Sequence, residues 1–412
     1  MVAVGDELLL GETVDTNAAW LGRELAALGV AVSRHYTVGD VEGEIREAVA
    51  LAMTRVDVVL VTGGLGPTRD DVTRDAVAAL LDRELGEDGA LLDALRARFR
   101  ERGYGRLPEP NRSQAMVPSG ARVLPNTAGT APGLALEHEG VLVVLLPGVP
   151  HELKTIFSGP LRQLLLDRLE GRLVPVRHRT IHTSGVPESR LSELVEEVLP
   201  ADVHPVSIAF LPDPLGVDLR LTVRGAAGDA AEARLDEVEA LLGPVVAPWR
   251  FEAASGDLAE AVSRRLRALE ATVAVAESCT GGLLAHRITM HPGAGDVFLG
   301  GVVAYANRIK VDVLGVPREA IERDGAVSEA VARAMALGVA DRFGADAGIA
   351  ITGVAGPDGG TEEKPVGTVW SCACFRGRVE CVERRLHGDR VGIQWRSTQE
   401  ALRLFGALVA GG

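Results

Sequence analysis

The sequence predicts an α/β protein in which two three-layer α/β domains with open, largely parallel sheets are joined by a small α+β domain. Short apolar, β-branched runs alternate with stretches of helical apolar spacing in residues 1–165 and again in residues 251–412, a pattern typical of βαβ units. The segment 166–250 lacks this long alternation. A chain of 412 residues is also too long for one hydrophobic core. We therefore expect domain boundaries near residues 165 and 250, with the proline-containing segment 244–248 as a linker.

Composition and charge disfavour several classes of function. Hydrophobic residues make up 47% of the chain, but no apolar run approaches the roughly 18 residues that a membrane-spanning helix needs. The first residues show no basic segment followed by an apolar one, so we expect a cytoplasmic protein without membrane association. The formal charge of −14 makes nucleic acid an unfavourable partner. The cysteine spacing matches neither a zinc site nor a CxxC pair, and Cys372 and Cys374 are expected to be reduced core residues.

The first domain is expected to alternate strands and helices from its first residues onward. Apolar residues recur at helical spacing after Thr16, and Gly29 marks the end of that helix. Because strands and helices alternate, the sheet should be parallel, with the carboxyl ends of its strands at one edge. In chain order the expected elements are a strand at Val2–Val4, a helix over residues 18–28, a strand at Val30–Val32, a helix over 42–54 and strands over 56–62 and 141–146.

The loops at that edge carry residues suited to a phosphorylated ligand. After the strand 56–62 comes the glycine-rich segment 63–68, where the backbone can approach a phosphate. Asp70 and Asp71 follow, and carboxylates are preferred ligands of hard divalent cations. Gly148 follows the strand 141–146. The alternatives are that Asp71 only caps a helix and that Gly63 and Gly64 only form a tight turn. No GxGxxG motif is present, so a Rossmann dinucleotide site finds no support.

The middle segment predicts two half-exposed strands, over residues 177–184 and 217–223, and two helices, over 189–198 and 230–242. Its one match to a nucleic-acid-binding GxxG loop is Gly225-Ala226-Ala227-Gly228. Residues 171–250 contain eight Lys or Arg against twelve Asp or Glu, a net charge of −4. We therefore favour a spacer or dimerisation element over an RNA-binding module.

The last domain is organised around Ser278, where a buried strand over residues 272–276 breaks into the turn Ser278–Gly282 before a helix over 283–290. A serine at such a junction can point its hydroxyl into a crevice, and free N–H groups of the turn and helix can hold an oxyanion. Serine needs a base, and Lys310, which follows a strand at Val302–Ala304, could supply it if desolvation lowers its pKa. Alternatively, Ser278 only caps the helix, or Cys279 is the nucleophile.

Two further segments are expected to reach this crevice. A strand over residues 348–351 ends in Thr352 and Gly353, and Arg390 opens the last helix, over 390–409. Its guanidinium could bind a carboxylate or phosphate over the sheet edge, although a solvated arginine is the simpler interpretation. A strand over 367–375, a strand over 379–386, and helices over 258–269 and 328–343 complete the expected domain.

Several motifs resemble those of the CinA family (competence/damage-inducible protein A). AESCTGG, YANRIK, ITGVAGP and HGDR are similar to the signatures of its C-terminal nicotinamide-nucleotide amidase domain. GDELLLGETVDTN, TGGLGPTRDDVT and LPGVPHEL resemble its N-terminal MoaB/Mog-like, molybdopterin-binding fold. The middle segment resembles the KH-like module between these two domains.

This resemblance implies a two-headed enzyme of pyridine-nucleotide recycling. It implies that Ser278 is the nucleophile and Lys310 the base in deamidation of nicotinamide mononucleotide, without a cofactor, and that the N-terminal domain is a metal-dependent ADP-ribose pyrophosphatase in a homodimer. The alternatives are an amidase with a degenerate N-terminal binding module, or a competence or DNA-damage scaffold without catalysis. The remaining implied site residues are Tyr305 and Thr352 in catalysis; Thr280, Gly281, Gly282, Gly353, Arg390, Asp15, Asn17, Gly63, Gly64, Gly66, Thr68 and Gly148 in substrate binding; and Asp70 and Asp71 at the metal.

Overall fold

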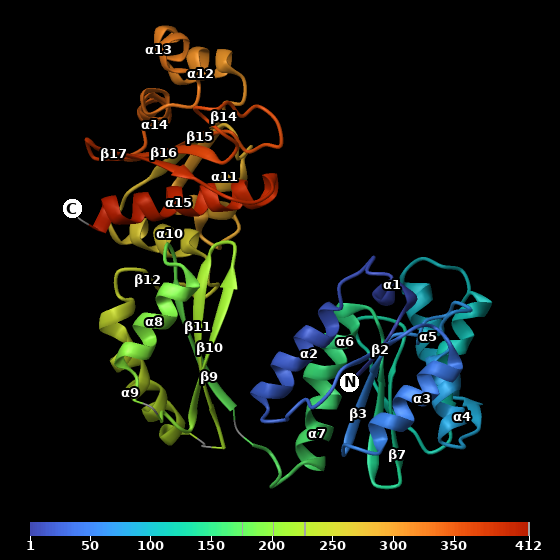
Figure 1. The fold of residues 1–412 in the computed structure, drawn as a ribbon. Coiled ribbons are helices and arrows are strands. Elements are labelled where there is room, and N and C mark those ends of the chain that lie inside the picture. Colours follow the sequence, from blue (N-terminus) through green and yellow to red (C-terminus); the bar gives the residue numbers. More distant parts are fainter. Residues whose placement is uncertain (175, 201, 226–227, 411–412) are drawn as a thin grey trace. The chain divides into compact units, whose positions relative to one another are not determined.

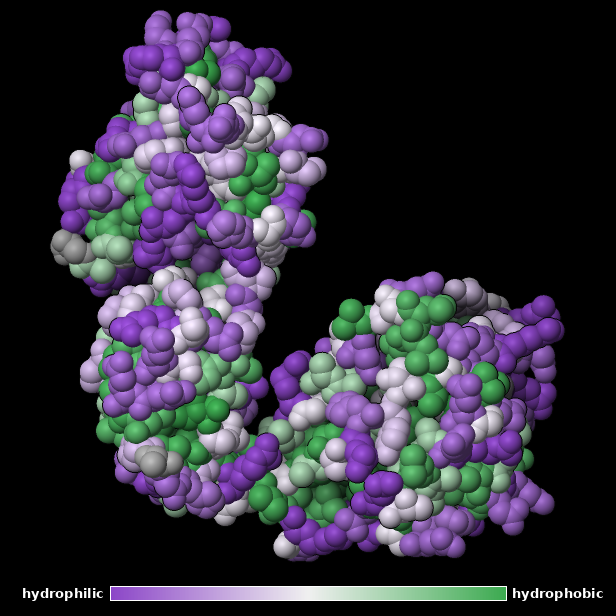
Figure 2. Space-filling view, in the orientation of Figure 1, coloured by the Kyte–Doolittle hydropathy of each residue, from purple (hydrophilic) through white to green (hydrophobic). Residues whose placement is uncertain are grey.

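The computed structural model describes residues 1–174, 176–200, 202–225 and 228–410. The chain divides into two compact units, the first formed mainly by Met1–Arg177 and the second by His178–Val223 with Asp229–Gly412. Figure 1 shows mixed helices and strands in both units, so the predicted α/β class is confirmed. Hydrophilic residues are spread over the visible surface of each unit, with hydrophobic ones in groups between them (Figure 2). Within the described residues, no helix is both long and apolar enough to cross a membrane.

A six-stranded sheet forms the centre of the first unit. Its strands are β1 (Val2–Val4), β2 (Tyr36–Val38), β3 (Val58–Thr62), β6 (Arg122–Leu124), β7 (Gly133–His138) and β8 (Val141–Leu146). They lie in the order β2-β1-β3-β8-β7-β6. The first four in that order pair in parallel, whereas β7 and β6 are antiparallel to their neighbours.

Helices cover both faces of this sheet and give the three expected layers (Figure 1). On one face Ile45 and Val77 pack with Val61 of β3. On the other face Leu21 and Ile156 pack with Leu60. The first face carries α3 (Glu42–Met53) and α4 (Thr73–Leu80), and the second carries α2 (Thr16–Ala27), α6 (Pro150–Ile156), a π-helical turn (Phe157–Leu161) and α7 (Arg162–Arg168). The smaller elements are α1 (Asp6–Leu9), β4 (Leu85–Glu87), α5 (Gly89–Glu101), a 3₁₀ helix (Glu109–Ala115) and β5 (Met116–Pro118).

The predicted strand at Val30–Val32 is wrong, because the strand beside β1 is Tyr36–Val38. After α2 the chain turns at Gly29, whose φ is +81°, and the Val30 N–H donates to the Leu25 carbonyl at 2.8 Å. Val30 and Val32 then pack against the core beneath α2. Their apolar character therefore reflects packing against a helix and not a place in the sheet.

The middle part of the chain forms a small α+β fold within the second unit. Its elements are β9 (Val176–Thr183), α8 (Glu188–Val198), β10 (Val206–Asp213), β11 (Gly216–Arg224), α9 (Asp229–Val246) and β12 (Arg250–Phe251). The four strands lie in the order β10-β11-β9-β12. The two predicted strands and two predicted helices are present, whereas β10 and β12 were missed. In the candidate GxxG loop, Ala226 and Ala227 lie outside the described residues.

A five-stranded sheet forms the centre of the C-terminal part. Its strands are β13 (Val273–Glu277), β14 (Phe298–Val303), β15 (Ala347–Gly353), β16 (Thr368–Phe375) and β17 (Arg378–Arg385), in the order β14-β13-β15-β16-β17. β13 pairs in parallel with both β14 and β15, and the other two pairings are antiparallel. The parallel strands therefore end together at one edge, as expected, although this sheet is mixed and not largely parallel.

Helices again cover both faces of the sheet. One face packs against α10 (Leu258–Ala268), α11 (Leu283–Thr289) and α15 (Arg390–Ala410). The opposite face packs against α12 (Asn307–Leu314), α13 (Arg318–Asp324) and α14 (Glu329–Phe343). A 3₁₀ turn (Ala294–Asp296) precedes β14. Cys372 and Cys381 face each other across β16 and β17 and form a disulfide, so the expectation of a reduced Cys372 is wrong, while Cys374 is free and buried.

Candidate active site

Ser278 lies immediately after β13, at the edge where the parallel strands of the C-terminal sheet end. Its N–H donates to the Ile351 carbonyl of β15 at 2.9 Å, which continues the ladder by one residue. The chain then turns through Gly281 and Gly282, whose φ angles are +62° and +105°, and enters α11. Only 9% of Ser278 is exposed. The strand–turn–helix junction predicted from the sequence is therefore present.

Lys310 extends from α12 to this serine. Its Nζ lies 3.0 Å from Ser278 Oγ, 2.7 Å from the Ala304 carbonyl oxygen and 3.3 Å from the Tyr305 carbonyl oxygen. Lys310 is 1% exposed. A neutral amine has two N–H groups and one lone pair. The two carbonyls can accept both N–H bonds, which leaves the lone pair for the serine hydroxyl.

Burial lowers the pKa of the Lys310 amine, because the ammonium form loses its hydration. Among the described residues no carboxylate forms an ion pair with Lys310. No ion pair therefore compensates the ammonium form for its lost hydration. A lysine with a lowered pKa can accept a proton near neutral pH. The Ser278–Lys310 pair thus has the geometry and the electrostatics of a nucleophile with its general base.

The turn after Ser278 leaves fewer free amides than its sequence suggests. The Gly281 N–H donates to the Ser278 carbonyl at 3.1 Å, and the Gly282 N–H donates to the carboxylate of Glu277 at 3.1 Å. These two amides are therefore engaged, contrary to their expected use for an oxyanion. No acceptor among the described residues contacts the Thr280 N–H, and the buried Thr280 hydroxyl also has no partner there. The N–H groups of Cys279 and Thr280 are therefore the backbone donors that the turn leaves available.

Tyr305, Thr352 and Gly353 lie at the same strand ends but do not contact the Ser278–Lys310 pair through their polar side chains. The Tyr305 phenol accepts a hydrogen bond from Arg390 at 2.9 Å, and the residue is 58% exposed. The buried Thr352 hydroxyl donates to the Ala326 carbonyl at 2.8 Å. Gly353 pairs with Val369 in the sheet. The catalytic roles that the resemblance implies for Tyr305 and Thr352 thus lack a direct side-chain contact with the pair.

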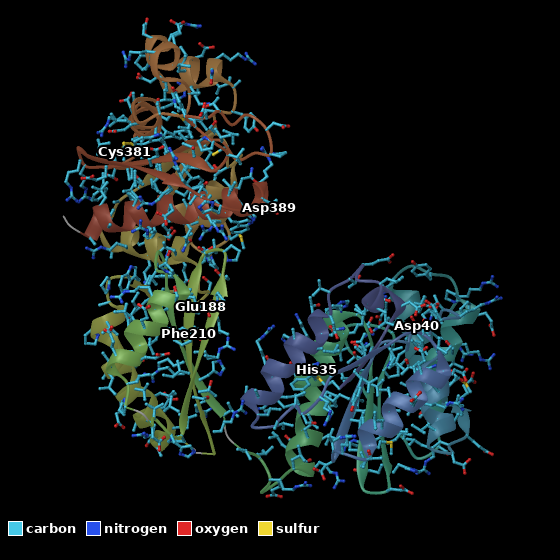
Figure 3. All side chains as sticks on the ribbon, viewed as in Figure 1. His35, Asp40, Glu188, Phe210, Cys381 and Asp389 are labelled. Carbon is cyan, nitrogen blue, oxygen red and sulfur yellow. A yellow bond between two sulfur atoms is a disulfide. The ribbon has the colours of Figure 1, made fainter. Side chains whose placement is uncertain are left out.

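The first turns of α15 bring two side chains to the site. Arg390 is exposed and donates to the Gly356 carbonyl at 2.6 Å, as well as to the Tyr305 phenol. Gln394, one turn further on, donates to the Cys279 carbonyl at 2.8 Å. Asp389, just before the helix (Figure 3), accepts the N–H of Gly392 at 2.8 Å. Sequence reasoning missed Gln394, although its i,i+4 spacing from Arg390 places both on one helix face.

A buried arginine network fixes α11 from its other side. Arg287 is fully buried and donates to Asp257 at 2.5 Å, to Thr398 at 2.8 Å and to Gln399 at 2.7 Å. The Gln399 amide in turn donates to Ser184 in the middle part of the chain at 2.9 Å. No pattern in the sequence distinguishes Arg287 from a surface residue. Its role depends on the packing of α11 against α15.

Cys279 is a poor nucleophile in this environment. Burial raises the pKa of its thiol to about 12, so the thiolate is scarce at neutral pH, and the thiolate is the reactive form. Glu277 is also close enough for its negative charge to raise that pKa further. The alternative that Cys279 and not Ser278 attacks a substrate is therefore disfavoured.

The N-terminal unit has a second group of polar residues at the carboxyl edge of its sheet. The Asp15 carboxylate caps α2 by accepting the Ala18 N–H at 2.8 Å. The Asn17 amide donates to the Gly148 carbonyl at 2.6 Å, and its buried Oδ1 has no partner among the described residues. Gly63 has a φ of +99°, and a Cβ on it would lie 2.2 Å from the Val4 carbonyl oxygen. Gly64, with a φ of +64°, is similarly crowded by Thr73.

Asp71 closes the glycine-rich loop at this sheet edge through hydrogen bonds. Its carboxylate accepts the N–H of Gly66 at 2.7 Å, the N–H of Thr68 at 2.8 Å and the Thr68 hydroxyl. It does not cap α4, whose first residue follows Val72 without a side-chain cap. Asp70 is exposed. No three His, Cys, Asp or Glu side chains in the described ranges are grouped so that they could hold a metal, so these residues do not fit a resident ion bound by protein alone.

Comparisons with known proteins cover nearly the whole chain. The CinA C-terminal domain matches residues 255–409, a probable molybdopterin binding domain matches 1–167, and the KH domain of damage-inducible protein CinA matches 178–249. A CinA-like protein of Gemmatimonas aurantiaca is 47% identical over 403 residues, which cover 98% of this chain and 94% of that protein. A relative from Moorella thermoacetica, named as a competence-damage inducible protein, is 45% identical over 407 residues, or 98% and 97% of the two chains. The crystal structure of a CinA superfamily protein from Klebsiella pneumoniae covers 38% of this chain and 97% of its own at 36% identity, with a TM-score of 0.37.

The burial of both free thiols predicts slow thiol chemistry. At pH 8 the native protein, without reductant, should react slowly with a chromogenic disulfide reagent, because burial raises the pKa of Cys279 and of Cys374 and covers both sulfurs. In denaturant both thiols should react at once. Absorbance of the released thiolate measures the rates. Rapid reaction of one native thiol, with the fold intact, would contradict the assignment of Cys279 as an inert neighbour of Ser278.

Proposed function

This chain belongs to the CinA family, and we propose that its C-terminal part hydrolyses the carboxamide of nicotinamide mononucleotide to nicotinate mononucleotide and ammonia. The observation that carries the proposal is the 3.0 Å contact between the desolvated Lys310 Nζ and Ser278 Oγ. A serine nucleophile needs an adjacent base within hydrogen-bond reach, and a desolvated lysine amine can serve as that base. In this proposal the protein is a hydrolase of the pyridine nucleotide cycle, acting in the cytoplasm as a homodimer on small-molecule substrates.

The proposed reaction has two steps with balanced proton transfers. Ser278 Oγ attacks the amide carbon while Lys310 takes its proton, and Lys310 then passes that proton to the leaving nitrogen, which departs as ammonia. In this proposal the free N–H groups of Cys279 and Thr280 donate to the oxygen that becomes negative during this step. Water next attacks the ester on Ser278, with Lys310 accepting its proton and returning it to the serine. The amidase needs no cofactor for these transfers.

Arg390 is the group proposed to recognise the nucleotide phosphate. Its guanidinium already donates to the Gly356 carbonyl and the Tyr305 phenol, so the side chain is held in one direction at the sheet edge. A fixed guanidinium binds phosphate oxygens through charge-assisted hydrogen bonds. The exposed Tyr305 ring beside it offers a face on which the pyridine ring can lie.

ADP-ribose hydrolysis in the N-terminal domain is the second candidate function. It is favoured by the glycine-rich turn at the carboxyl edge of the sheet, where Gly63 and Gly64 adopt positive φ angles, and by the unpartnered Oδ1 of Asn17. Because the residues present do not fit a resident metal, a cation for this reaction has to arrive with the pyrophosphate, as Mg²⁺ commonly does. A binding module without catalysis is the competing interpretation, and a scaffold in competence or DNA damage is a third.

Removing the nucleophile should abolish deamidation. For Ser278→Ala we expect kcat to fall at least about 10³-fold, with an unchanged melting temperature, because the contact with Lys310 is the one hydrogen bond that the hydroxyl forms among the described residues. Ammonia release from nicotinamide mononucleotide is the measurement. Ser263→Ala, which removes a buried hydroxyl from α10 in the same domain, should retain activity. Normal turnover by Ser278→Ala would refute the assignment.

Activity should depend on pH through Lys310. Only the neutral amine accepts a proton, and burial lowers the pKa of Lys310. The value of kcat should therefore be lost as the pH falls through that lowered pKa and reach a plateau above it. The midpoint is expected below the ordinary lysine value of about 10.4. A profile of kcat, which reports the enzyme–substrate complex, measures it. A midpoint at the ordinary lysine value would contradict a desolvated base.

The N-terminal candidate predicts a separable, metal-sensitive activity. The protein should convert ADP-ribose to AMP and ribose 5-phosphate when a divalent metal is added, and a chelator should stop this reaction but spare deamidation. Asp71→Ala releases three hydrogen bonds of the phosphate loop and should weaken ADP-ribose binding by about tenfold or more, about 1.4 kcal/mol. Calorimetry measures ADP-ribose binding, and AMP formation measures ADP-ribose hydrolysis. Ser278→Ala is the control and should retain both the binding and the hydrolysis. Binding without hydrolysis under any metal would support the binding-module interpretation.

A further inference from the structure

Glu277, the last residue of β13, carries a buried carboxylate directly beside the proposed nucleophile. It is 1% exposed. One carboxylate oxygen accepts the N–H groups of Gly282 at 3.1 Å and Leu284 at 2.9 Å, and the other accepts the N–H of Ala285 at 2.9 Å. No Lys, Arg or His in the described ranges forms an ion pair with it. The cost of burying this charge is therefore offset by backbone amides at the start of α11.

The turn that these bonds restrain has little other support. Gly281 and Gly282 both adopt positive φ angles, and glycine has the widest conformational freedom of any residue. Within the turn only two backbone bonds form, from Gly281 to Ser278 and from Leu283 to Thr280, both at 3.1 Å. Gln394 holds the Cys279 carbonyl from outside. The Glu277 carboxylate is the group that connects the strand end to the first turn of α11.

The same bonds determine which amides remain for a substrate. Gly282, Leu284 and Ala285 donate to Glu277, and the N–H groups of Gly281 and Leu283 are used within the turn. The N–H groups of Cys279 and Thr280 are left without an acceptor among the residues described. We propose that Glu277 is a positioning residue of the amidase: by binding three amides it fixes the turn so that the Ser278 hydroxyl faces Lys310 and the free Cys279 and Thr280 N–H groups face the reacting oxygen. This inference rests on the proposed function.

Glu277→Gln tests the inference with almost no change of shape. The amide keeps one acceptor oxygen but turns an NH₂ group toward at least one backbone N–H, so at least one of the three bonds is lost. A shift of about 1 Å at a reacting group can cost about 10²-fold in rate. We expect kcat for nicotinamide mononucleotide to fall by about that factor, with KM nearly unchanged, because the carboxylate contacts the turn and not the substrate. The fall should be parallel at every pH, because Glu277 is not among the groups that shift the pKa of Lys310.

Asp257→Asn is the matched control. Asp257 is also a mostly buried carboxylate of this domain, and it also supports α11, through Arg287, but it does not contact the turn at Ser278. This variant should lower the melting temperature while leaving kcat of the folded enzyme unchanged. A purely structural role for Glu277 would make the two variants behave alike. Loss of kcat in Glu277→Gln alone, with both variants folded by circular dichroism, supports positioning.

A second measurement tests the positioning role of Glu277 without relying on the proposed substrate. A serine-directed fluorophosphonate probe, located on Ser278 by peptide mass spectrometry, reports on the nucleophile without nicotinamide mononucleotide. We expect Glu277→Gln to be labelled at least about tenfold more slowly than the unaltered chain. If the unaltered chain is labelled but releases no ammonia, the proposed function fails and the labelling rates still decide the positioning role. Equal labelling and equal kcat in Glu277→Gln, or no labelling of Ser278 in either protein, would overturn the inference.

Discussion

The buried contact between Lys310 and Ser278 is the constraint on which the C-terminal domain depends. An amine removed from water is costly unless its hydrogen-bonding groups are satisfied. Two carbonyls just beyond the end of β14, those of Ala304 and Tyr305, satisfy them. They lie there because β14 ends at Val303 in register with Glu277 of β13. Parallel pairing thus brings the Ser278 hydroxyl and the two acceptors of the Lys310 amine to one edge of the sheet.

The polar loops of the two sheets lie at comparable positions. Each group lies at the carboxyl edge of parallel strands covered by helices on both faces, where loops can differ without disturbing the core. In the N-terminal loop the Asp71 carboxylate accepts hydrogen bonds from its own loop. In the C-terminal turn the Glu277 carboxylate plays a similar part beside Ser278. The groups left unpartnered, the Asn17 Oδ1 and the Thr280 hydroxyl, therefore mark where a ligand can add hydrogen bonds.

The sequence predicted the fold class, most strands and helices, and the proximity of Ser278 to Lys310, because these follow from apolar periodicity and from parallel strands ending together. Two kinds of feature escaped it. Val30–Val32 is apolar for packing beneath a helix, and periodicity cannot distinguish that from a strand. The contacts of Gln394, Arg287 and Thr352 depend on how α15, α11 and the loop at Ala326 meet the sheet, which no local pattern specifies.

The hydrogen bond from Gln399 to Ser184 connects the middle and C-terminal parts of the chain. This connection matters for protein engineering. Gln399 also accepts from the fully buried Arg287, so the guanidinium that braces α11 is linked to the middle part through one amide. A fragment that starts after residue 250 would keep every group around Ser278 but would exchange Ser184 for water at this amide. Chimeras between relatives should therefore carry the middle and C-terminal parts from the same parent.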